Sequence, residues 1–170
     1  MMCGITGTPG TGKSSVADEL ARRGYPVVRL EETIGGYVIG EDAKRDTRII
    51  DEDRWAGEFT PVEGIVEGHL AHLLPCDRVV ILRCRPDVLL DRLRSRGYSE
   101  GKCRENAEAE ALDVCLIETL ERHASKQVLE LDTTGMTPAR AADIIVDFLE
   151  GRIPASHGRI DWSDYLMGAV

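Results

Sequence analysis

Residues 7–14 have the sequence GTPGTGKS, which matches the pattern G-x-x-x-x-G-K-[ST] at every fixed position. A short apolar strand pattern at residues 3–6 precedes this segment, and an amphipathic helix pattern at residues 13–23 follows it. The glycines let backbone N–H groups turn inward around a phosphate, and the helix adds its positive N-terminal end. The segment therefore predicts a loop that binds a nucleoside triphosphate; a glycine-rich turn that binds nothing is the alternative.

Two side chains of this loop carry the predicted chemistry. Lys13 is placed to reach the β- and γ-phosphates, and the hydroxyl of Ser14 to complete the coordination of Mg²⁺. A dinucleotide-binding turn is excluded, because the pattern G-x-G-x-x-G is absent here.

The rest of the 170 residues alternates short apolar runs with helical patterns, which predicts one α/β domain with a five-stranded parallel sheet flanked by helices. The predicted strands are residues 3–6, 26–30, 64–66, 78–84 and 128–131. The predicted helices are residues 13–23, 87–96, 104–125 and a last one with Thr137 as N-cap, Pro138 as its first residue and Gly151 past its end. Residues 97–102 are a predicted break. Residues 31–61 have only weak periodicity and no clear regular structure, and such long stretches are more often functional than idle.

The composition excludes several classes of protein. The net charge of −9, from 30 acidic and 21 basic residues, argues against a protein that coats nucleic acid by charge alone. Five cysteines without a CxxC pair favour reduced thiols over a disulfide framework or a zinc site. We expect no leader, because the first strand begins almost at Met1, and a cytoplasmic location away from the membrane.

The class of phosphate-binding protein follows from what accompanies the loop. A GTPase would need a guanine-recognising N-K-x-D pattern, which is missing, and large motor or transporter ATPases need a longer chain. Small metabolite and nucleotide kinases fit this length. They need an acceptor-binding insertion after the second strand, which is where residues 31–61 lie.

Seven further segments occur in an order and spacing that extend over nearly the whole chain. They are IDED (50–53), EGHLAHL (67–73), VILR (80–83), RLRSRGYS (92–99), ENAEAE (105–110), DTTG (132–135) and the pair Asp161–Trp162. With residues 7–14, they resemble the archaeal and eukaryotic small adenylate kinase family, also called adenylate kinase isoenzyme six or coilin-interacting nuclear ATPase. The Asp-Trp pair resembles the archaeal branch.

This resemblance implies a P-loop nucleoside monophosphate kinase fold. It implies a main domain at residues 1–151, with an NMP-binding segment at about 30–53, a lid at about 95–105 and a C-terminal tail at 152–170. It also implies a Mg²⁺-dependent adenylate kinase, converting ATP and AMP into two ADP, with ATPase activity. A further implication is assistance in small ribosomal subunit maturation and rRNA processing. The partners would then be a platform ribosomal protein and the pre-ribosome, without sequence-specific nucleic-acid binding. The implied ATP contacts are Gly10, Gly12, Lys13, Ser14, Ser15 and, in the lid, Arg96.

Two residues after the third strand are candidates for chemistry. Glu67 lies at the carboxyl edge of the sheet, where open α/β sheets bind ligands. Eukaryotic relatives have Asp-x-His where this chain has Glu67-Gly68-His69, so the longer Glu67 side chain would meet the Mg²⁺ water shell at a different angle. We expect Glu67 to act on Mg²⁺, directly or through water, with an ordinary strand-end carboxylate as the alternative. His69 would orient water or a phosphate, or be structural.

The basic residues divide into three groups. Arg96 is the predicted catalytic arginine of the lid, with Gly97 as its hinge, whereas Arg92, Arg94 and Lys102 are interpreted as solvated helix positions. Arg83 ends its strand either facing phosphates or paired with a carboxylate. The candidates for holding an acceptor phosphate are Lys44, Arg45, Arg48 and Arg54.

Two alternatives to a metabolic adenylate kinase remain open. The first is a ribosome-assembly ATPase with little metabolic role, which the acidic surface would suit. The second is a kinase for another small acceptor, such as a shikimate- or gluconate-like metabolite. It is less favoured, because the sequence lacks a convincing cluster of arginines for a carboxylate.

Overall fold

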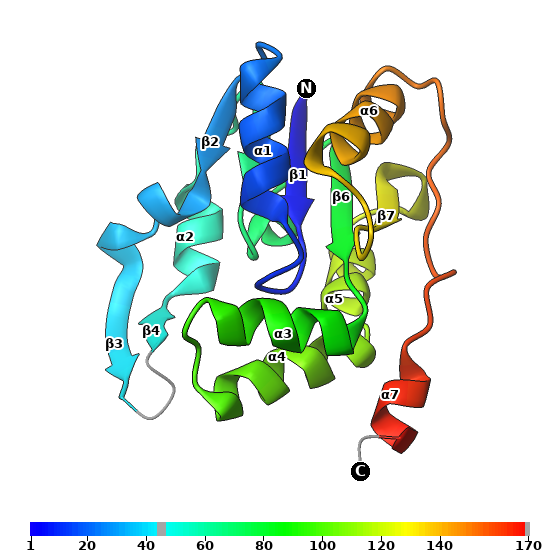
Figure 1. Cartoon of the computed structure of the whole chain (residues 1–170). Coiled ribbons are helices and arrows are strands. Elements are labelled where there is room, and N and C mark those ends of the chain that lie inside the picture. Colours follow the sequence, from blue (N-terminus) through cyan, green and yellow to red (C-terminus); the bar gives the residue numbers. More distant parts are fainter. Residues whose placement is uncertain (44–46, 169–170) are drawn as a thin grey trace.

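The computed structural model describes residues 1–43 and 47–168, and its centre is a parallel sheet with the strand order β2-β5-β1-β6-β7 (Figure 1). The strands are β1 (Met2–Thr6), β2 (Val27–Arg29), β5 (Gly64–Glu67), β6 (Arg78–Arg83) and β7 (Val128–Asp132). The predicted α/β fold with a five-stranded parallel sheet is confirmed, and every strand end lies within one residue of its prediction. The sheet's carboxyl edge therefore collects the loops that follow β1, β2, β5, β6 and β7.

Helices cover both faces of this sheet. On one face pack α1 (Lys13–Arg22) and α6 (Pro138–Leu149), and on the other α2 (Glu52–Glu58) and α5 (Val114–Arg122) (Figure 1). The last predicted helix is confirmed as α6: its N-cap, Thr137, accepts from the backbone N–H of Arg140. Two further helices, α3 (Pro86–Ser95) and α4 (Glu100–Ala111), pack together at the carboxyl edge of the sheet.

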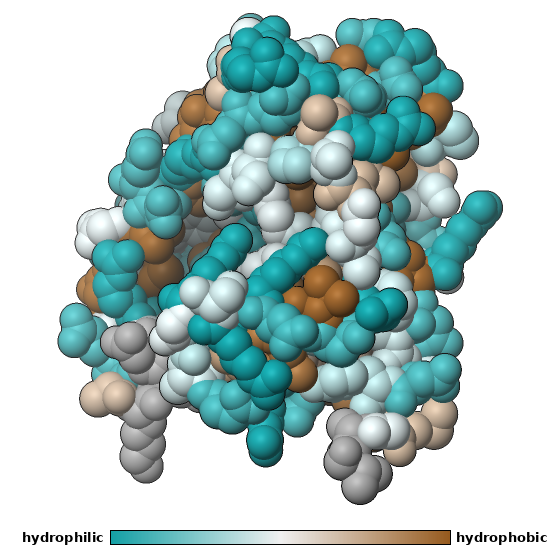
Figure 2. All heavy atoms as spheres, viewed as in Figure 1, coloured by the Kyte–Doolittle hydropathy of each residue, from teal (hydrophilic) through white to brown (hydrophobic). Residues whose placement is uncertain are grey.

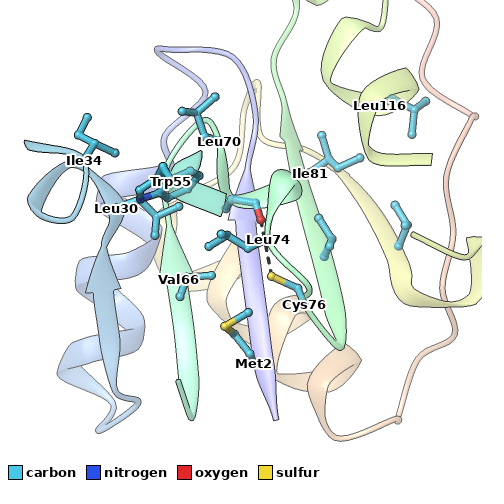
Figure 3. Close-up of a cluster of buried hydrophobic side chains, with 13 residues drawn as sticks. Met2, Leu30, Ile34, Trp55, Val66, Leu70, Leu74, Cys76, Ile81 and Leu116 are labelled. Atoms are coloured by element: carbon cyan, nitrogen blue, oxygen red, sulfur yellow. Dashed lines mark hydrogen bonds between the residues drawn. The ribbon is translucent and has the colours of Figure 1, made fainter. Parts of the chain in front are cut away.

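Strand alternation divides the core into two apolar layers, because successive side chains point to opposite faces. Ile5 and Val80 face α1 and α6. Met2 and Ile81 face the opposite layer, where Trp55 of α2 is 1% exposed. Figure 3 shows this second cluster, in which Trp55 lies beside Leu30 and below Leu70. Burying such a layer stabilises the fold by about 25 cal/mol per Å² of apolar surface removed from water.

The stretch at residues 31–61 is more regular than predicted. It contains an antiparallel hairpin, β3 (Val38–Asp42) paired with β4 (Thr47–Ile50), followed by α2. The prediction of no clear regular structure is wrong for these elements. No residue of the two strands is fully buried, so the sequence of the hairpin is not held to an alternation of apolar and polar residues. Two residues in which we predicted acceptor contacts, Lys44 and Arg45, lie outside the described residues.

The single helix predicted at residues 104–125 is wrong, because the structure has two. Asp113, with φ of +57°, ends α4 and begins α5. Aspartate tolerates this left-handed conformation better than most residues. The predicted break at 97–102 is also shorter, since Ser99 caps α4 by accepting from the backbone N–H of Lys102. The side chain that holds Asp113 at its break lies in the sheet.

A buried ion cluster around Arg83 holds Asp113 at this break. Arg83 is 1% exposed, and its Nε donates to Glu110 Oε1 at 2.6 Å. Its Nη2 donates to Asp113 Oδ1 at 2.5 Å and to the backbone carbonyl of Glu110 at 2.9 Å, and its Nη1 donates to Glu130. Burial alone lowers the pKa of Arg83, but these carboxylates raise it above its usual value, so the guanidinium stays charged. Of the two interpretations of Arg83, pairing with carboxylates is confirmed.

The same cluster connects β6 to the phosphate-binding loop and the tail. Thr8 Oγ1 donates to Glu110 Oε2 at 2.5 Å, which holds the loop from beneath. The backbone N–H of Gly158 donates to Glu130 Oε2 at 2.8 Å, so the tail is fastened along the outer edge of β7. Beyond this point the tail descends beside the sheet and ends in α7 (Ser163–Gly168) next to α4 (Figure 1).

The outer surface of the molecule is mainly polar. Figure 2 shows hydrophilic side chains over most of one face, with hydrophobic ones in small, separate patches. All five cysteines are free thiols, and four of them are buried. None of the helices in residues 1–43 and 47–168 has the length and apolarity that a bilayer crossing requires.

We expect Arg83→Met to lower the free energy of unfolding by about 3–5 kcal/mol, because it leaves three carboxylates without their buried counter-charge. Urea unfolding at neutral pH measures this loss. The matched control is Arg85→Met, which removes an exposed pair with Asp87 two residues along the chain. If the two variants unfolded at the same urea concentration, the cluster would not have the structural role described here.

Candidate functional site

A cleft of about 410 Å³ opens at the carboxyl edge of the sheet. Its wall consists of the phosphate-binding loop, the loop after β5, the β3–β4 hairpin and the segment that joins α3 to α4. A second cavity, of about 330 Å³, lies on the other side of the phosphate-binding loop, against the residues after β7. The two cavities bring together the residues predicted for catalysis, ATP contacts and Mg²⁺, namely Gly10, Gly12, Lys13, Ser14, Ser15, Glu67, His69 and Arg96.

The phosphate-binding loop has a backbone that only glycine accepts at two of its positions. Gly7 has φ of +138°, and a side chain there would strike the carbonyl oxygen of Leu82. Gly10 has φ of +92°, and a Cβ would come within 2.8 Å of Leu89 Cδ1. The close approach to β6 explains the first fixed glycine of the pattern, Gly7, whereas Gly10 occupies a variable position of the pattern and is required here by its contact with α3.

Lys13 is buried under this loop, with 9% of its surface exposed. Its Nζ donates to the carbonyl oxygens of Gly7, at 2.7 Å, and Thr8, at 3.0 Å. Burial lowers the pKa of Lys13 to about 8, although the nearby Glu67 charge acts in the opposite direction. The side chain is therefore a cation held at the floor of the cleft and able to lose its proton in mild alkali.

Glu67 lies across from Lys13 and links two elements. Its Oε1 accepts from the hydroxyl of Ser14 at 3.3 Å, and its Oε2 accepts from Arg29 Nη1 at 2.8 Å. Sequence reasoning missed Arg29. The signal was available, because Arg29 ends β2 at the same sheet edge at which Glu67 ends β5.

The pair Ser14–Glu67 fits the magnesium ion that the sequence predicts. A hydroxyl and a carboxylate oxygen are hard donors of the kind Mg²⁺ prefers, and this ion usually takes only one or two protein ligands beside phosphates and water. No cluster of three or more His, Cys, Asp or Glu side chains able to hold a metal is found in the described part of the chain. A magnesium ion here would thus depend on Ser14, Glu67 and the phosphates of the ligand, whose charge it would neutralise.

His69 stands at the mouth of the cleft with an exposed ring. The surrounding protein and the charge of Lys13 lower its pKa below the usual value, although solvent at this exposed position weakens both effects. The backbone carbonyl of His69 accepts from Thr6 Oγ1 at 3.0 Å, which fixes the loop. A neutral imidazole facing the cleft is suited to orienting water or a phosphate.

The second histidine of this segment faces away from the cleft. His72 is 3% exposed, with Nδ1 at 2.9 Å from Thr6 Oγ1 and Nε2 at 3.0 Å from Glu118. His123 Nε2 lies 2.9 Å from the carbonyl oxygen of His72. These two histidines fasten α5 beneath the loop that carries His69.

The interpretation of Arg92 and Lys102 as solvated helix positions is wrong. The guanidinium of Arg92 donates to the carbonyl oxygens of Gly10, at 3.3 Å, and Thr134, at 3.0 Å, and so joins the phosphate-binding loop to the loop after β7. Lys102 lines the cleft, with Nζ 5.0 Å from the centre of the Tyr98 ring. A local helical pattern does not show which charged side chain the tertiary fold turns inward. Arg94 is exposed, as predicted, and it pairs with Glu100.

The predicted acceptor-phosphate residues are also separated by the structure. Arg48, on β4, lines the cleft. Arg54 is exposed on α2, where its Nε donates to Glu58 Oε1 at 3.0 Å and its guanidinium lies 5.5 Å from the centre of the Tyr37 ring. Of the candidates that the structure describes, Arg48 is the one that faces the site.

Comparison with known proteins places these features in a family. Residues 3–113 match the family model described as an AAA domain. A protein of Methanothermobacter thermautotrophicus named "Putative adenylate kinase" is 46% identical over 99% of this chain and 100% of its own length. A protein of the same name from Archaeoglobus fulgidus is 46% identical over 95% of this chain and 92% of its own.

Two of the solved structures with a similar fold are kinases. A shikimate kinase from Acinetobacter baumannii superposes with a TM-score of 0.62 at 17% identity, over 89% of this chain and 93% of its own. A deoxyadenosine kinase from M. mycoides superposes with a TM-score of 0.54 at 15% identity, over 88% of this chain and all of its own. At these identities the likeness establishes the P-loop kinase fold and no more.

The lowered pKa of Lys13 predicts proton uptake when a polyphosphate binds. At pH 8 about half of the Lys13 side chains are neutral in the free protein, and the charge of ATP restores the proton. Calorimetric titration with ATP and Mg²⁺ at pH 8, in buffers of different ionisation enthalpy, should show an uptake of about half a proton per site. An uptake of zero between pH 8 and 9 would contradict this account of Lys13.

Proposed function

Because this chain belongs to the AAA domain family, together with the archaeal relatives described above, we propose that it is a Mg²⁺-dependent adenylate kinase that converts ATP and AMP into two ADP. The family and the fold make it a nucleotide kinase, a phosphotransferase that uses ATP. AMP as the acceptor is the proposal. The observation that carries it is the single cleft in which the phosphate-binding loop and the β3–β4 hairpin face each other.

The lining of this cleft matches a nucleoside monophosphate. Apolar side chains from the β2–β3 connection, from β4 and from the loop after β5 offer a surface for a base; they are Leu30, Ile34, Ile50 and Leu70. Cations line the same cleft at Lys13, Arg48, Arg96 and Lys102, so two sets of phosphates would meet between them. In a chain of net charge −9, this local concentration of positive charge favours anionic substrates.

The proposed reaction is a direct transfer between the two nucleotides. An oxygen of the acceptor phosphate attacks the γ-phosphorus of ATP, the bond to the β–γ bridging oxygen breaks, and ADP leaves from each side. Lys13 would neutralise charge on the β- and γ-phosphates, and Ser14 with Glu67 would hold Mg²⁺. Arg96, at the end of α3, would close over the transferred group.

We propose that residues 1–151 form the kinase domain and that the segments surrounding the cleft have distinct roles in it. We propose residues 30–53 as the acceptor-binding segment and residues 95–105 as the lid, with 152–170 as an appended tail. Gly10, Gly12 and Ser15, which line the second cavity, would contact ATP together with Arg96. His69 would orient water or a phosphate at the cleft mouth.

A second proposed activity is ATP hydrolysis linked to small ribosomal subunit maturation, with a basic platform ribosomal protein as partner. The acidic balance of the chain supports it, since opposite charge speeds and orients association with a basic partner. Affinity capture from the host, with and without ATP, tests this role. Small-subunit ribosomal proteins released by ATP would support it, and a purely metabolic kinase would retain none.

Acceptor profiling tests the main proposal. We expect phosphoryl transfer from ATP to AMP in a coupled assay that also offers CMP, dAMP, GMP, shikimate and gluconate, with phosphate release measured in the absence of acceptor. Lys13→Ala should lower kcat/KM by about 100-fold or more, because it removes a charge that stabilises the transition state. Transfer to shikimate or gluconate alone would replace the proposal with a metabolite kinase, and a fully active Lys13→Ala would show that the site is misplaced.

The acceptor end of the cleft has its own test. Arg48→Ala should raise the KM for the monophosphate about tenfold, because it removes a charged hydrogen bond to the acceptor phosphate, while the KM for ATP stays the same. Arg54→Ala is the matched control, since Arg54 lies outside the cleft lining on the neighbouring helix. Equal effects of the two substitutions would show that Arg48 does not hold the acceptor.

A further inference from the structure

Arg29 and Glu67 end neighbouring strands and are direct partners in the parallel register of β2 and β5. Residues paired in this way point to the same face of a sheet, and here the face is the one covered by α1. A one-residue shift of either strand would send one of the two side chains to the opposite face. The fold of the sheet therefore brings the guanidinium to the carboxylate.

The contacts of Arg29 form a bridge behind the cleft. Its Nη1 donates to Glu67 Oε2 at 2.8 Å and approaches the backbone carbonyl of Ser14 at 3.4 Å. Its Nη2 donates to Asp18, on α1. Glu67 lines the cleft, whereas Arg29 stands behind it, outside the lining.

This bridge leaves one oxygen of Glu67 for the site. With Oε2 occupied by Arg29, the other oxygen, Oε1, lies 3.3 Å from the hydroxyl of Ser14. A glutamate has one more rotatable bond than an aspartate, so it loses more freedom when held in one position. A planar guanidinium that contacts two elements at once fixes such a side chain better than a single point charge.

We propose that Arg29 is a positioning residue, which holds Glu67 so that Oε1 stays beside the Ser14 hydroxyl, where the magnesium ion of the nucleotide would bind. The inference rests on the proposed function, because it concerns the metal-binding part of the same site. Asp18 anchors the far side of the guanidinium and thereby acts on Glu67 through Arg29. The alternative is an ion pair that only fastens β2 to α1.

The experiment compares ATP binding with and without the metal. We would measure the Kd for ATP by calorimetry in Mg²⁺ and in EDTA, and take the ratio as the gain due to Mg²⁺. The variants are Arg29→Gln, Arg29→Lys and Asp18→Asn. Arg22→Gln is the control, since Arg22 lies on α1 and forms an exposed pair with Glu19. Urea unfolding without ligand checks that each variant folds.

We expect Arg29→Gln to lower the Mg²⁺-dependent gain about tenfold and to leave the Kd in EDTA unchanged. Arg29→Lys and Asp18→Asn should lose part of the gain, and Arg22→Gln none. In a Glu67→Gln background, Arg29→Gln should cause no further loss, because its effect passes through Glu67. Should Arg29→Gln not fold, Asp18→Asn carries the test, since the Asp18 side chain is 74% exposed.

Two results would overturn the inference. In the first, Arg29→Gln changes the Kd for ATP in neither Mg²⁺ nor EDTA; in the second, it weakens ATP binding equally in both, which a merely structural pair would do. In both cases the wild-type protein would still transfer phosphate to AMP, so the proposed function would stand. If the wild type showed neither a Mg²⁺-dependent gain nor phosphoryl transfer, the proposed function and the inference would fail together.

Discussion

The buried guanidinium of Arg83 is the interaction on which the candidate site depends. Its partner Glu110 accepts from Thr8 at 2.5 Å and so supports the phosphate-binding loop from beneath. Thr133 Oγ1 donates to the backbone carbonyl of Arg83 at 2.8 Å. The same hydroxyl lies 2.7 Å from the carbonyl of Thr11 in the phosphate-binding loop. Arg83 thus connects the sheet, α4 and the loop after β7 to the phosphate-binding loop. A charge cluster this deeply buried is costly unless every member is paired, which favours a single arrangement of the loop.

The cleft above this support is built from opposed charges. Lys13 lies at its floor, Glu67 across from it, and Arg48 on the hairpin at the other end. Elsewhere the chain is acidic, so these few cations create the positive potential that a phosphate-bearing ligand needs. Burial lowers the pKa of Lys13, and the neighbouring Glu67 charge partly restores it. The Glu67 carboxylate therefore favours the charged form of Lys13 and, in our proposal, binds the metal.

Much of this arrangement could be predicted from the sequence. The five strands and the phosphate-binding loop were predictable, because apolar runs and a fixed pattern of glycines are local signals. The break at Asp113 was not, since the partner that holds Asp113 there is Arg83, 30 residues away. The positions of Arg92 and Arg29 at the site could not be predicted for a similar reason. A charged residue on a helix or at a strand end has the same local sequence pattern whether it faces water or a site. The exposed hairpin has no apolar period by which to recognise it.

The central claim is that the cleft and the second cavity beside it hold the two nucleotides of one phosphoryl transfer. Binding of two adenosines joined by a chain of five phosphates tests it most directly. We predict that one molecule binds per chain and that it displaces both bound ATP and bound AMP, because its two ends occupy both nucleotide sites. Displacement of ATP alone, with AMP binding unaffected, would contradict the claim and place the acceptor elsewhere.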